Sequence, residues 1–381
     1  MVGYNMLRRF IERYRSRLQV ILQAAIVVFV LYIAYSAVVN YQLNSQRMAL
    51  SFGWSFLADA SGFLVHQSWL THSHLDSNTH VLLVGLLNTL VVSCVAMLLS
   101  SLLGIFLASL HYTNHPLLVL TAQGYTDIFR NVPLLVQIMF WYNLWIHKLP
   151  ILRDSWYLGG MMINNRGVFV PDPIQFMSVW LLFMLLWLGL LAAHLLYQSY
   201  YRSALGLSFL IWSIVLVVGM IPWLSLPQLV GFNIRNALHI YPSFIGLCAA
   251  LTTYTAAFNA EIIRGAMLAV PTGQIEVGRS LGLSSWQIYR YVVLPQILPA
   301  VLPNMSSQYL NIAKNSSLGR AVGYPEVFAV FAGTVLNQTG KAVEIMLLVM
   351  LIYLLLSLCI IRVCQYFDNQ QRYWTERDAF G

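Results

Sequence analysis

The residues most able to do a defined job lie in a polar stretch between two long apolar ones. Glu276 is followed by Gly282, and after nine intervening residues comes a Val-x-Leu-Pro sequence that ends at Leu294 and Pro295. The chain has no nucleophile–base set, no HExxH and no GxSxG motif, so catalysis by its own residues is not expected. A polar loop of this length is costly to maintain unless a soluble partner binds it. The chemistry that this loop suggests is therefore recognition of another protein.

The helix-start and helix-stop residues of this loop predict two short helices. Pro271 suits the first turn of a helix, and Gly282 suits the left-handed position that ends one. Ser284 with Gln287 three residues later has the pattern of a capping box for a second helix. Pro295 is expected to stop that helix or to redirect it into the membrane. The result is a helix, a tight turn and a helix, a form that can dock in a groove of a partner.

The residues expected to make this contact lie on the two helices and at the turn. Glu276 and Arg279 are three residues apart and form a charged face, while Leu281 and Leu283 supply apolar side chains beside the turn. The full set is Glu276, Val277, Gly278, Arg279, Leu281, Gly282, Leu283, Ser284, Leu294 and Pro295. A plain amphipathic connector is the alternative interpretation. The stretch LGLSSWQIYRYV also resembles part of a DNA-binding helix-turn-helix, but it lacks a basic face, so nucleic acid is not an expected partner.

The composition predicts the elements that must position this loop. Of the 381 residues, 59% are hydrophobic and 9% are charged, whereas soluble domains carry about 25% charged residues. A transmembrane helix needs about 20 apolar residues, and eight stretches qualify: 18–39, 81–110, 131–147, 174–196, 207–230, 240–260, 296–313 and 342–361. The expected fold class is all-α, a polytopic protein of the lipid bilayer. The first stretch is longer than the apolar region of a signal peptide, about 7–15 residues, so we expect a retained anchor.

The arginines predict the orientation of these spans. Five of them lie between residues 8 and 17, just before the first apolar stretch, which favours a cytoplasmic amino terminus under the positive-inside rule. Alternating the eight spans then places the 265–295 loop and the carboxyl terminus in the cytoplasm as well. The net charge of +8 is otherwise scattered along the chain, which again gives no indication of nucleic-acid binding.

The chain divides into a smaller core and two additions. We expect Gly159–Pro173 to be an ordered loop, because it is rich in Gly, Asn and Pro. The predicted segments are an N-terminal anchor with its loops (1–80), a first core part (81–147), an inserted loop and helical hairpin (148–240), a second core part with the cytoplasmic loop (241–364) and a cytoplasmic tail (365–381).

Polar side chains repeat along one face of the seventh apolar stretch. Their spacings of four, three and four place Asn304, Gln308, Asn311 and Asn315 on one side of a helix, with Lys314 towards the outer end. Such a face either lines a pathway for a polar substrate or hydrogen-bonds to a neighbouring helix, and the sequence leaves both possibilities open.

Charged and polar residues elsewhere in the spans have simpler structural interpretations. Glu261 precedes Arg264 by three residues and is expected to form an ion pair that fixes the inner end of its span, with substrate contact as the alternative. Asp127 and Arg130 allow the same pairing. Asn88 and Thr89, at 88–89, are expected to serve packing.

A metal site and a nucleotide site are both unexpected from the sequence. His72, His74, Asp76 and His80 lie in one polar loop, but His-x-His spacing is common by chance, so we predict no metal ligand there. The four cysteines form no CxxC pair. The sequence has no phosphate-binding P-loop either, since Gly340-Lys341 lacks the following Ser or Thr. We therefore expect no cofactor in this chain, and any ATP-driven motor must be a separate chain.

Several blocks of the sequence resemble a known family. The pattern that starts at Glu276 resembles the "EAA" signature of ATP-binding-cassette importer permeases, although Val277 and Gly278 replace the two usual alanines. Four blocks in the order GLLNTLVVS, FRNVPLLVQ, AEIIRGAMLAVPTGQ and KNSSLGRAVGYPEV resemble permeases of polar amino-acid importers. NNRG at 164–167 and GFLVHQS at 62–68 resemble the larger subunit type of general L-amino-acid permeases.

The resemblance implies a function and a set of partners. It implies a core of five spans in a bacterial inner membrane, paired with a second, homologous permease. It also implies two ATPase subunits that bind ATP and Mg, a periplasmic amino-acid-binding protein and an L-amino acid as substrate. In that family Glu276–Leu283 would be the helix that couples the membrane subunit to the ATPase. The main alternative is an ion-coupled secondary transporter, which leaves the 271–295 loop unexplained and would be expected to show internal repeats. A purely structural assembly subunit and an intramembrane enzyme are the remaining alternatives.

Overall fold

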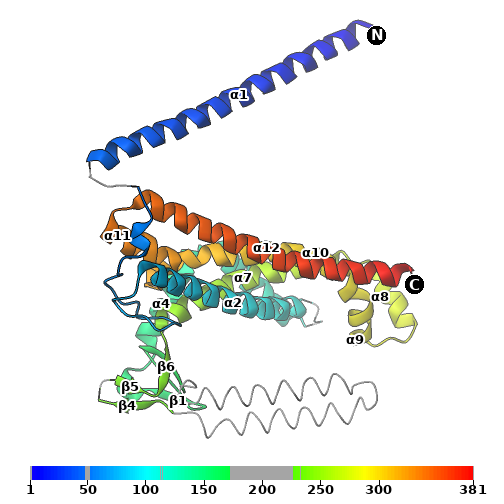
Figure 1. Cartoon of the computed structure of the whole chain (residues 1–381). Helices are drawn as coiled ribbons and strands as arrows, with labels where there is room; N and C mark the ends of the chain where they lie inside the picture. Colours follow the sequence, from blue (N-terminus) through cyan, green and yellow to red (C-terminus); the bar gives the residue numbers. More distant parts are fainter. Residues whose placement is uncertain are drawn as a thin grey trace.

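The structure is a computed structural model that describes residues 2–47, 52–111, 113, 115–171, 226–231 and 233–380. It is mainly helical, as expected from the composition (Figure 1). The long helices are α1 (Val2–Arg47), α2 (Asn78–Leu110), α3 (Pro116–Asn131), α4 (Leu134–Lys148), α7 (Pro242–Leu268), α10 (Leu294–Asn315) and α12 (Ala342–Phe380). The predicted span 174–196 and most of the predicted span 207–230 lie outside the described residues.

Helix α7 lies inside the bundle and contacts α2, α3, α4 and α10. Small residues allow the close approach of these helices. A Cβ atom on Gly104 of α2 would lie 2.6 Å from Asn259 Cβ of α7, and a Cβ atom on Gly246 of α7 would lie 2.9 Å from Tyr142 Cα of α4. Small side chains at helix contacts are the usual means of packing helices in a membrane, where lipid is as apolar as leucine.

Three of the described helices are long and apolar enough to cross a membrane: Gln19–Leu43 within α1, α2, and Ala342–Tyr366 within α12. Helix α1 lies apart from the bundle (Figure 1), and none of its apolar stretch is buried in the chain. Its exposed Val, Ile, Leu and Phe side chains are compatible with surrounding lipid. Helix α12 continues past the predicted span 342–361, so the predicted tail 365–381 is helical up to Phe380.

One helix was not predicted from the sequence. Helix α3 occupies the stretch before the predicted span 131–147, and it mixes apolar residues with Gln123, Asp127 and Arg130. A continuous run of about 20 apolar residues is the signal that marks a span, and this amphipathic stretch does not give it. Helix α4 then begins at Leu134 and has 15 residues.

The region predicted as a loop, Gly159–Pro173, contains strands instead. Strands β1 (Trp156–Leu158), β2 (Met161–Asn164), β3 (Gly167–Pro171) and β6 (Ala237–Ile240) form an antiparallel sheet in that order. Gly159 and Gly160 have positive φ values of 57° and 84°, which lets the chain reverse tightly between β1 and β2. Strands β4 (Gln228–Val230) and β5 (Asn233–Arg235) form a second pair, so the end of the predicted span 207–230 is a strand and not a membrane helix.

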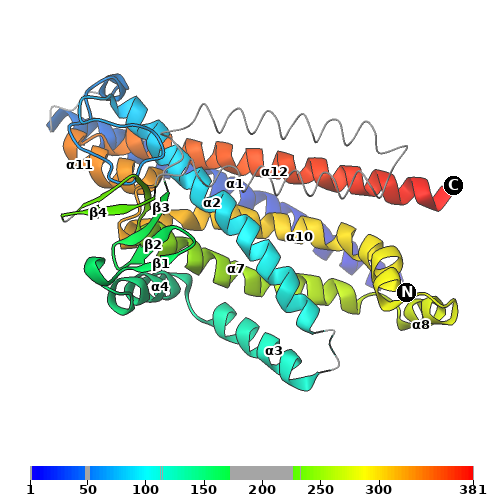
Figure 2. The ribbon, with the colours of Figure 1, turned by 90° about the horizontal axis from the view of Figure 1, so that it is seen from below.

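The bundle has two different ends (Figures 1 and 2). At one end lie α8 (Thr272–Ser280) and α9 (Ser285–Ile288), together with the end of α12 and, along the same axis, the beginning of α1. At the other end lie the sheets, the 52–77 segment and α11 (Leu336–Thr339). Shorter helical turns complete the part of the chain that the structure describes: 3₁₀ turns at Ser55–Leu57, Leu152–Asp154 and Ser316–Val322, and π-helical turns at Tyr289–Val293 and Ala329–Val335.

Candidate functional site: the helical loop and the polar face of α10

Helix α8 ends as the sequence predicts. Gly282 has a φ of +77°, the left-handed conformation that glycine adopts without a Cβ clash. The N–H of Gly282 donates to the carbonyl of Arg279 at 3.0 Å, and the N–H of Leu283 donates to the carbonyl of Gly278 at 3.1 Å. This pair of bonds is a Schellman motif, which satisfies the last carbonyls of the helix. Pro271 precedes the first turn of α8 as the N-cap.

Helix α9 starts as predicted but continues differently. Ser284 Oγ accepts from the N–H of Gln287 at 3.3 Å, and Gln287 Oε1 accepts from the N–H of Ser284 at 2.8 Å, which is the predicted capping box. Pro295 was expected to stop this helix or to redirect it into the membrane, and it does not stop it. The chain passes through the π-helical turn at Tyr289–Val293 directly into α10. Pro295 lies in the first turn of α10, directly after this π-helical turn.

An apolar core fixes the loop to the ends of the long helices. Ile288 is 4% exposed and packs with Ile263 and Met267 of α7, Ala108 of α2 and Ile297 of α10. These side chains come from three long helices, so the loop is packed against the end of the bundle.

The glycine that replaces an alanine of the family pattern has a packing explanation. A Cβ atom on Gly278 would lie 3.0 Å from Ile288 Cγ1. The absence of a side chain at Gly278 therefore lets α8 lie directly on α9. Gln296 of α10 also donates to Gln274 of α8 at 2.7 Å, which adds a polar tie between α10 and α8. These contacts make α8, α9 and the start of α10 one packed unit.

The outer surface of this loop carries large apolar side chains. Val277 is 60%, Leu281 74%, Trp286 69% and Tyr291 70% exposed. Glu276, Arg279 and Arg290 are exposed as well. Exposed apolar side chains gathered on one end of a protein are typical of a protein-binding surface. Sequence analysis did not single out Trp286 and Tyr291, although two large aromatic residues in a polar loop were a signal that could have indicated them.

A groove of about 860 Å³ lies beside the loop. It runs between α2, α7, the loop and α10, and its walls are mostly apolar, including Ile105, Met267, Ile297 and Tyr309. Tyr309 forms a hydrogen bond with Ser101 of α2 at 2.7 Å. The groove is lined in part by residues of the loop, so its shape depends on the position of the loop.

The predicted polar face of α10 points away from the chain's own core. Asn304, Asn311 and Lys314 are exposed, and Gln308 and Asn315 are half-buried. Within the described residues, Asn304 donates only to Ala300 of its own helix at 2.8 Å, and neither Gln308 nor Asn311 bonds to another helix. The alternative in which this face joins α10 to a neighbouring helix of the same chain therefore has no support in the described part.

Glu261 is held by arginines, as the spacing suggested. The Arg264 Nε atom lies 2.8 Å from Glu261 Oε1, and Arg264 Nη2 lies 2.9 Å from Glu261 Oε2. The predicted pairing of Arg130 with Asp127 is not what the fold gives. Arg130 of α3 instead reaches Glu261 of α7 at 3.9 Å and covers the ring of Phe258. The fold had to bring α3 against α7 for this contact to form.

The opposite end of the bundle contains the packing residues of α2. The amide of Asn88 donates to the carbonyls of Gln67 and Pro325 at 2.9 and 2.8 Å. Thr89 accepts from the N–H of Val327 at 3.2 Å. Both side chains are fully buried, so the packing role predicted for 88–89 is confirmed.

A buried carboxylate that sequence analysis missed lies next to this contact. Glu326 is completely buried and accepts from the N–H of Phe328 at 2.7 Å, from the N–H of Ala329, and from the hydroxyl of Tyr353 at 2.7 Å. It satisfies free N–H groups at the start of a helical turn. An acidic residue directly before an apolar run was the available signal.

These features define a class of protein: a helical membrane protein with a packed helical loop exposed at one end of its bundle. The model of the family "Binding-protein-dependent transport system inner membrane component" matches residues 100–373. The chain belongs to this family.

The chain is similar to several permease proteins over most of their length. The chain is 38% identical over 340 residues to the putative amino-acid ABC transporter permease protein YhdX of Escherichia coli (strain K12), covering 84% of this chain and 86% of that protein. It is 34% identical over 362 residues to the general L-amino acid transport system permease protein AapQ of Rhizobium johnstonii, covering 91% and 89%. It is 30% identical over 365 residues to the glutamate/glutamine/aspartate/asparagine transport system permease protein BztB of Rhodobacter capsulatus, covering 84% and 86%. The resemblance read from the sequence blocks is thereby confirmed.

Proposed function

We propose that this chain is the membrane-spanning permease subunit of an ATP-driven importer for polar and general L-amino acids. The names of the relatives support the substrate class. The observation that carries the proposal is the packed α8–α9 loop, whose surface offers Val277, Leu281 and Trp286 to a partner. The chain itself holds no nucleotide motif, so the ATPase that drives transport is a separate subunit.

The proposed partners follow from this arrangement. Two ATPase subunits, which bind ATP and Mg, dock on the α8–α9 loop of this chain and on the corresponding loop of a second, homologous permease. A periplasmic binding protein delivers the amino acid at the opposite end of the bundle. The loop, the beginning of α1 and the end of α12 lie at the same end of the molecule (Figures 1 and 2), which supports both termini being cytoplasmic in a bacterial inner membrane.

The polar face of α10 is the proposed wall of the substrate path. Among the described residues, Asn304, Asn311 and Lys314 of this face are exposed and Gln308 is half-buried. A second permease packed there would enclose a pathway whose amides and ammonium group can hydrogen-bond to a zwitterion. Glu261 is already held by Arg264, so we assign it to positioning the inner end of α7.

Coupling in this proposal depends on rigidity. The Schellman motif and capping box keep the loop folded, and Ile288 joins it to three long helices. When the ATPase subunits close on ATP, they would move this unit as a lever. The movement would switch the path between two states, as alternating access requires.

The test compares two leucines that have nearly equal exposure and lie at opposite ends of the bundle. Leu281 is 74% exposed on the loop, and Leu75 is 75% exposed in the 52–77 segment. Each is changed to alanine in a complex of this chain with its second permease, ATPase and binding protein. Binding of the ATPase to the detergent-solubilised permeases and ATP-dependent uptake of labelled L-amino acids into proteoliposomes are then measured.

The expected result is that Leu281→Ala weakens ATPase binding and uptake together, while Leu75→Ala leaves ATPase binding unchanged. A loss of about 2 kcal/mol in binding would be typical of a hot-spot residue. Uptake driven by an ion gradient without ATP, and indifferent to Leu281, would contradict the proposal and favour a secondary transporter.

A further inference from the structure

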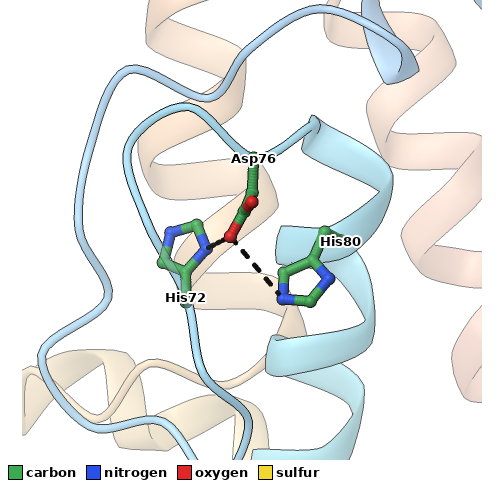
Figure 3. Close-up of side chains that lie close together, drawn as sticks. All are labelled: His72, Asp76 and His80. Atoms are coloured by element: carbon green, nitrogen blue, oxygen red, sulfur yellow. Dashed lines mark ion pairs between the residues drawn. The ribbon is translucent and has the colours of Figure 1, made fainter.

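A cluster of ionisable side chains lies at the end of the bundle opposite the α8–α9 loop. His72 lies in the 52–77 segment, Asp76 precedes α2 and His80 lies in the first turn of α2 (Figure 3). Asp76 Oδ2 is 3.4 Å from His72 Nδ1 and 3.8 Å from His80 Nε2. One ligand-type atom from each of the three residues lies within 4.8 Å of the other two. The spacing of these residues in the sequence did not predict a metal site, and only the fold brings the three atoms together.

The position of the ring hydrogen on His72 explains why this cluster favours a bound cation. Its Nε2 atom lies 3.1 Å from the carbonyl oxygen of Phe63, and a ring nitrogen that faces a carbonyl must carry the hydrogen. In a neutral ring Nδ1 then has only a lone pair. That atom is buried without a hydrogen-bond partner and faces the carboxylate of Asp76. A lone pair held against a carboxylate is unfavourable unless a proton or a metal ion stands between them.

The distances favour a metal ion in this position. Zinc binds imidazole nitrogen and carboxylate oxygen at about 2.0–2.2 Å in a tetrahedral arrangement, which places two ligand atoms about 3.4 Å apart. The His72–Asp76 separation already equals this value. The His80–Asp76 separation exceeds it by a few tenths of an ångström, and His80 is 36% exposed, so it is free to adjust.

The surroundings of the cluster hold its members in place. The N–H of Ser73 donates to Asp76 Oδ2 at 2.8 Å, and the Phe63 carbonyl fixes the ring of His72, whose side chain is only 1% exposed. Ligand histidines usually donate their other ring N–H to a carbonyl in this manner. His80 is held less well. Its Nε2 atom faces the Thr71 carbonyl at 2.9 Å and so carries a hydrogen; to bind the metal, the ring must shift that hydrogen to Nδ1 and give up this bond.

We propose that His72, Asp76 and His80 bind one divalent transition-metal ion, with zinc as the best fit to two imidazoles and a carboxylate. Three protein ligands leave a coordination position for water. The bound ion would connect His72 to the first turn of α2. It would thereby hold the 52–77 segment against the bundle. The proposal is independent of the substrate and of the ATPase.

Zinc binding to the full chain tests the proposal. The protein is purified in detergent with an affinity tag that contains no histidine, stripped with a chelator and titrated with Zn²⁺ against a chromogenic competitor. Wild type should bind one equivalent. Asp76→Asn, His72→Gln and His80→Gln should each weaken binding at least about 10-fold, since even partners outside the ligand set change metal affinity about 10–100-fold. His74→Gln is the matched control, because His74 is an exposed histidine of the same loop and should bind zinc as wild type does.

Thermal unfolding without metal separates loss of the site from loss of the fold. Asp76→Asn and His80→Gln change partly exposed side chains, so they should unfold in the absence of zinc at the wild-type temperature. Only wild type and the control His74→Gln should gain thermal stability when zinc is added. The proposal is overturned if wild type binds no stoichiometric zinc, or if the three ligand variants bind it as tightly as His74→Gln does.

Discussion

The α8–α9 loop and the segment that covers the other end of the bundle hold their backbones by different means. The loop is fixed by helix caps and by apolar packing around Ile288, and its outer surface is left apolar. At the other end, buried polar side chains make the connections: Asn88 joins α2 to Gln67 and Pro325, and Glu326 joins a helical turn to Tyr353.

A second carboxylate extends this polar network. Glu344 of α12 is 2% exposed and accepts from the N–H of Gly53 at 3.3 Å. The caps and the apolar core keep the internal geometry of the loop, as the proposed movement with an ATPase subunit would require. The other end is built to keep a fixed position on the bundle, because hydrogen bonds to buried groups are costly to break.

The largest expected effect comes from breaking the buried network. Glu326→Ala leaves the N–H of Phe328, the N–H of Ala329 and the hydroxyl of Tyr353 without their acceptor. We expect it to lower the free energy of unfolding by about 3 kcal/mol. Glu276→Ala removes an exposed carboxylate at the docking end and should change stability by less than about 0.5 kcal/mol. Denaturant unfolding in detergent measures both, and equal losses would contradict the comparison.

A smaller effect, in binding and not in stability, is expected at the docking surface. Trp286 is 69% exposed on α9, and Trp156 is 57% exposed on β1 at the opposite end. Trp286→Ala should weaken binding of the ATPase subunit by about 2 kcal/mol, or about 30-fold, because buried aromatic residues dominate protein interfaces. Trp156→Ala should leave that affinity unchanged. A binding titration with purified ATPase subunit decides the matter, and equal affinities for the two variants would remove Trp286 from the interface.

The helix cap of the loop gives a third, intermediate effect. Gly282 has a φ of +77°, whereas Gly273 lies in the first turn of α8 with open space around it. Gly282→Ala should cost about 1 kcal/mol, since an L-residue is strained in the left-handed region. Gly273→Ala should be neutral or stabilising by up to about 1 kcal/mol, since alanine is the better helix former. Hydrogen exchange of the 272–288 amides reports the local stability, and the opposite order would refute the capping argument.

The smallest effect concerns pH and the sheet at the other end. Burial lowers the pKa of His239 below its usual 6.5, where its ring stacks on Phe169 at 4.1 Å. The folded chain therefore binds this proton less readily than the unfolded chain, so stability is complete above pH 6.5 and falls as the pH drops below that value. His239→Phe keeps the stack and removes the titration. Thermal unfolding between pH 5 and 8 should show a decline for wild type that is smaller in the variant, and parallel curves would exclude His239 as the cause.

The sequence predicted the features that depend on local chemistry. The caps at Gly282 and Ser284 were predictable because a positive φ and a side-chain acceptor are properties of single residues and short spacings. The Glu261–Arg264 pair was predictable for the same reason. The packing role of 88–89 followed from the cost of polar groups inside an apolar span.

The features that the sequence did not predict depend on which elements meet. Arg130 reaches Glu261 only because α3 packs on α7, and no spacing within α3 encodes that contact. The sheet near Gly159 was not predicted, because the turn residues of this stretch are equally common in loops. The exposure of Trp286 and the open side of α10 follow from how the helices are oriented, which an amphipathic pattern alone does not specify for a membrane protein.

The π-helical turn at Tyr289–Val293 sets the rotational phase of α10 relative to the docking loop. A π turn contains about one more residue than an α-helical turn, and one residue corresponds to a rotation of roughly 100° about the helix axis. The direction of the α10 side that carries Asn304 and Asn311 is therefore set in part by the π-helical turn at the start of the helix, and not only by the order of residues along it. If the turn relaxed to regular α-helix as the loop moved, the polar face would rotate out of its present direction, while the bond from Asn304 to Ala300 within the helix would be kept.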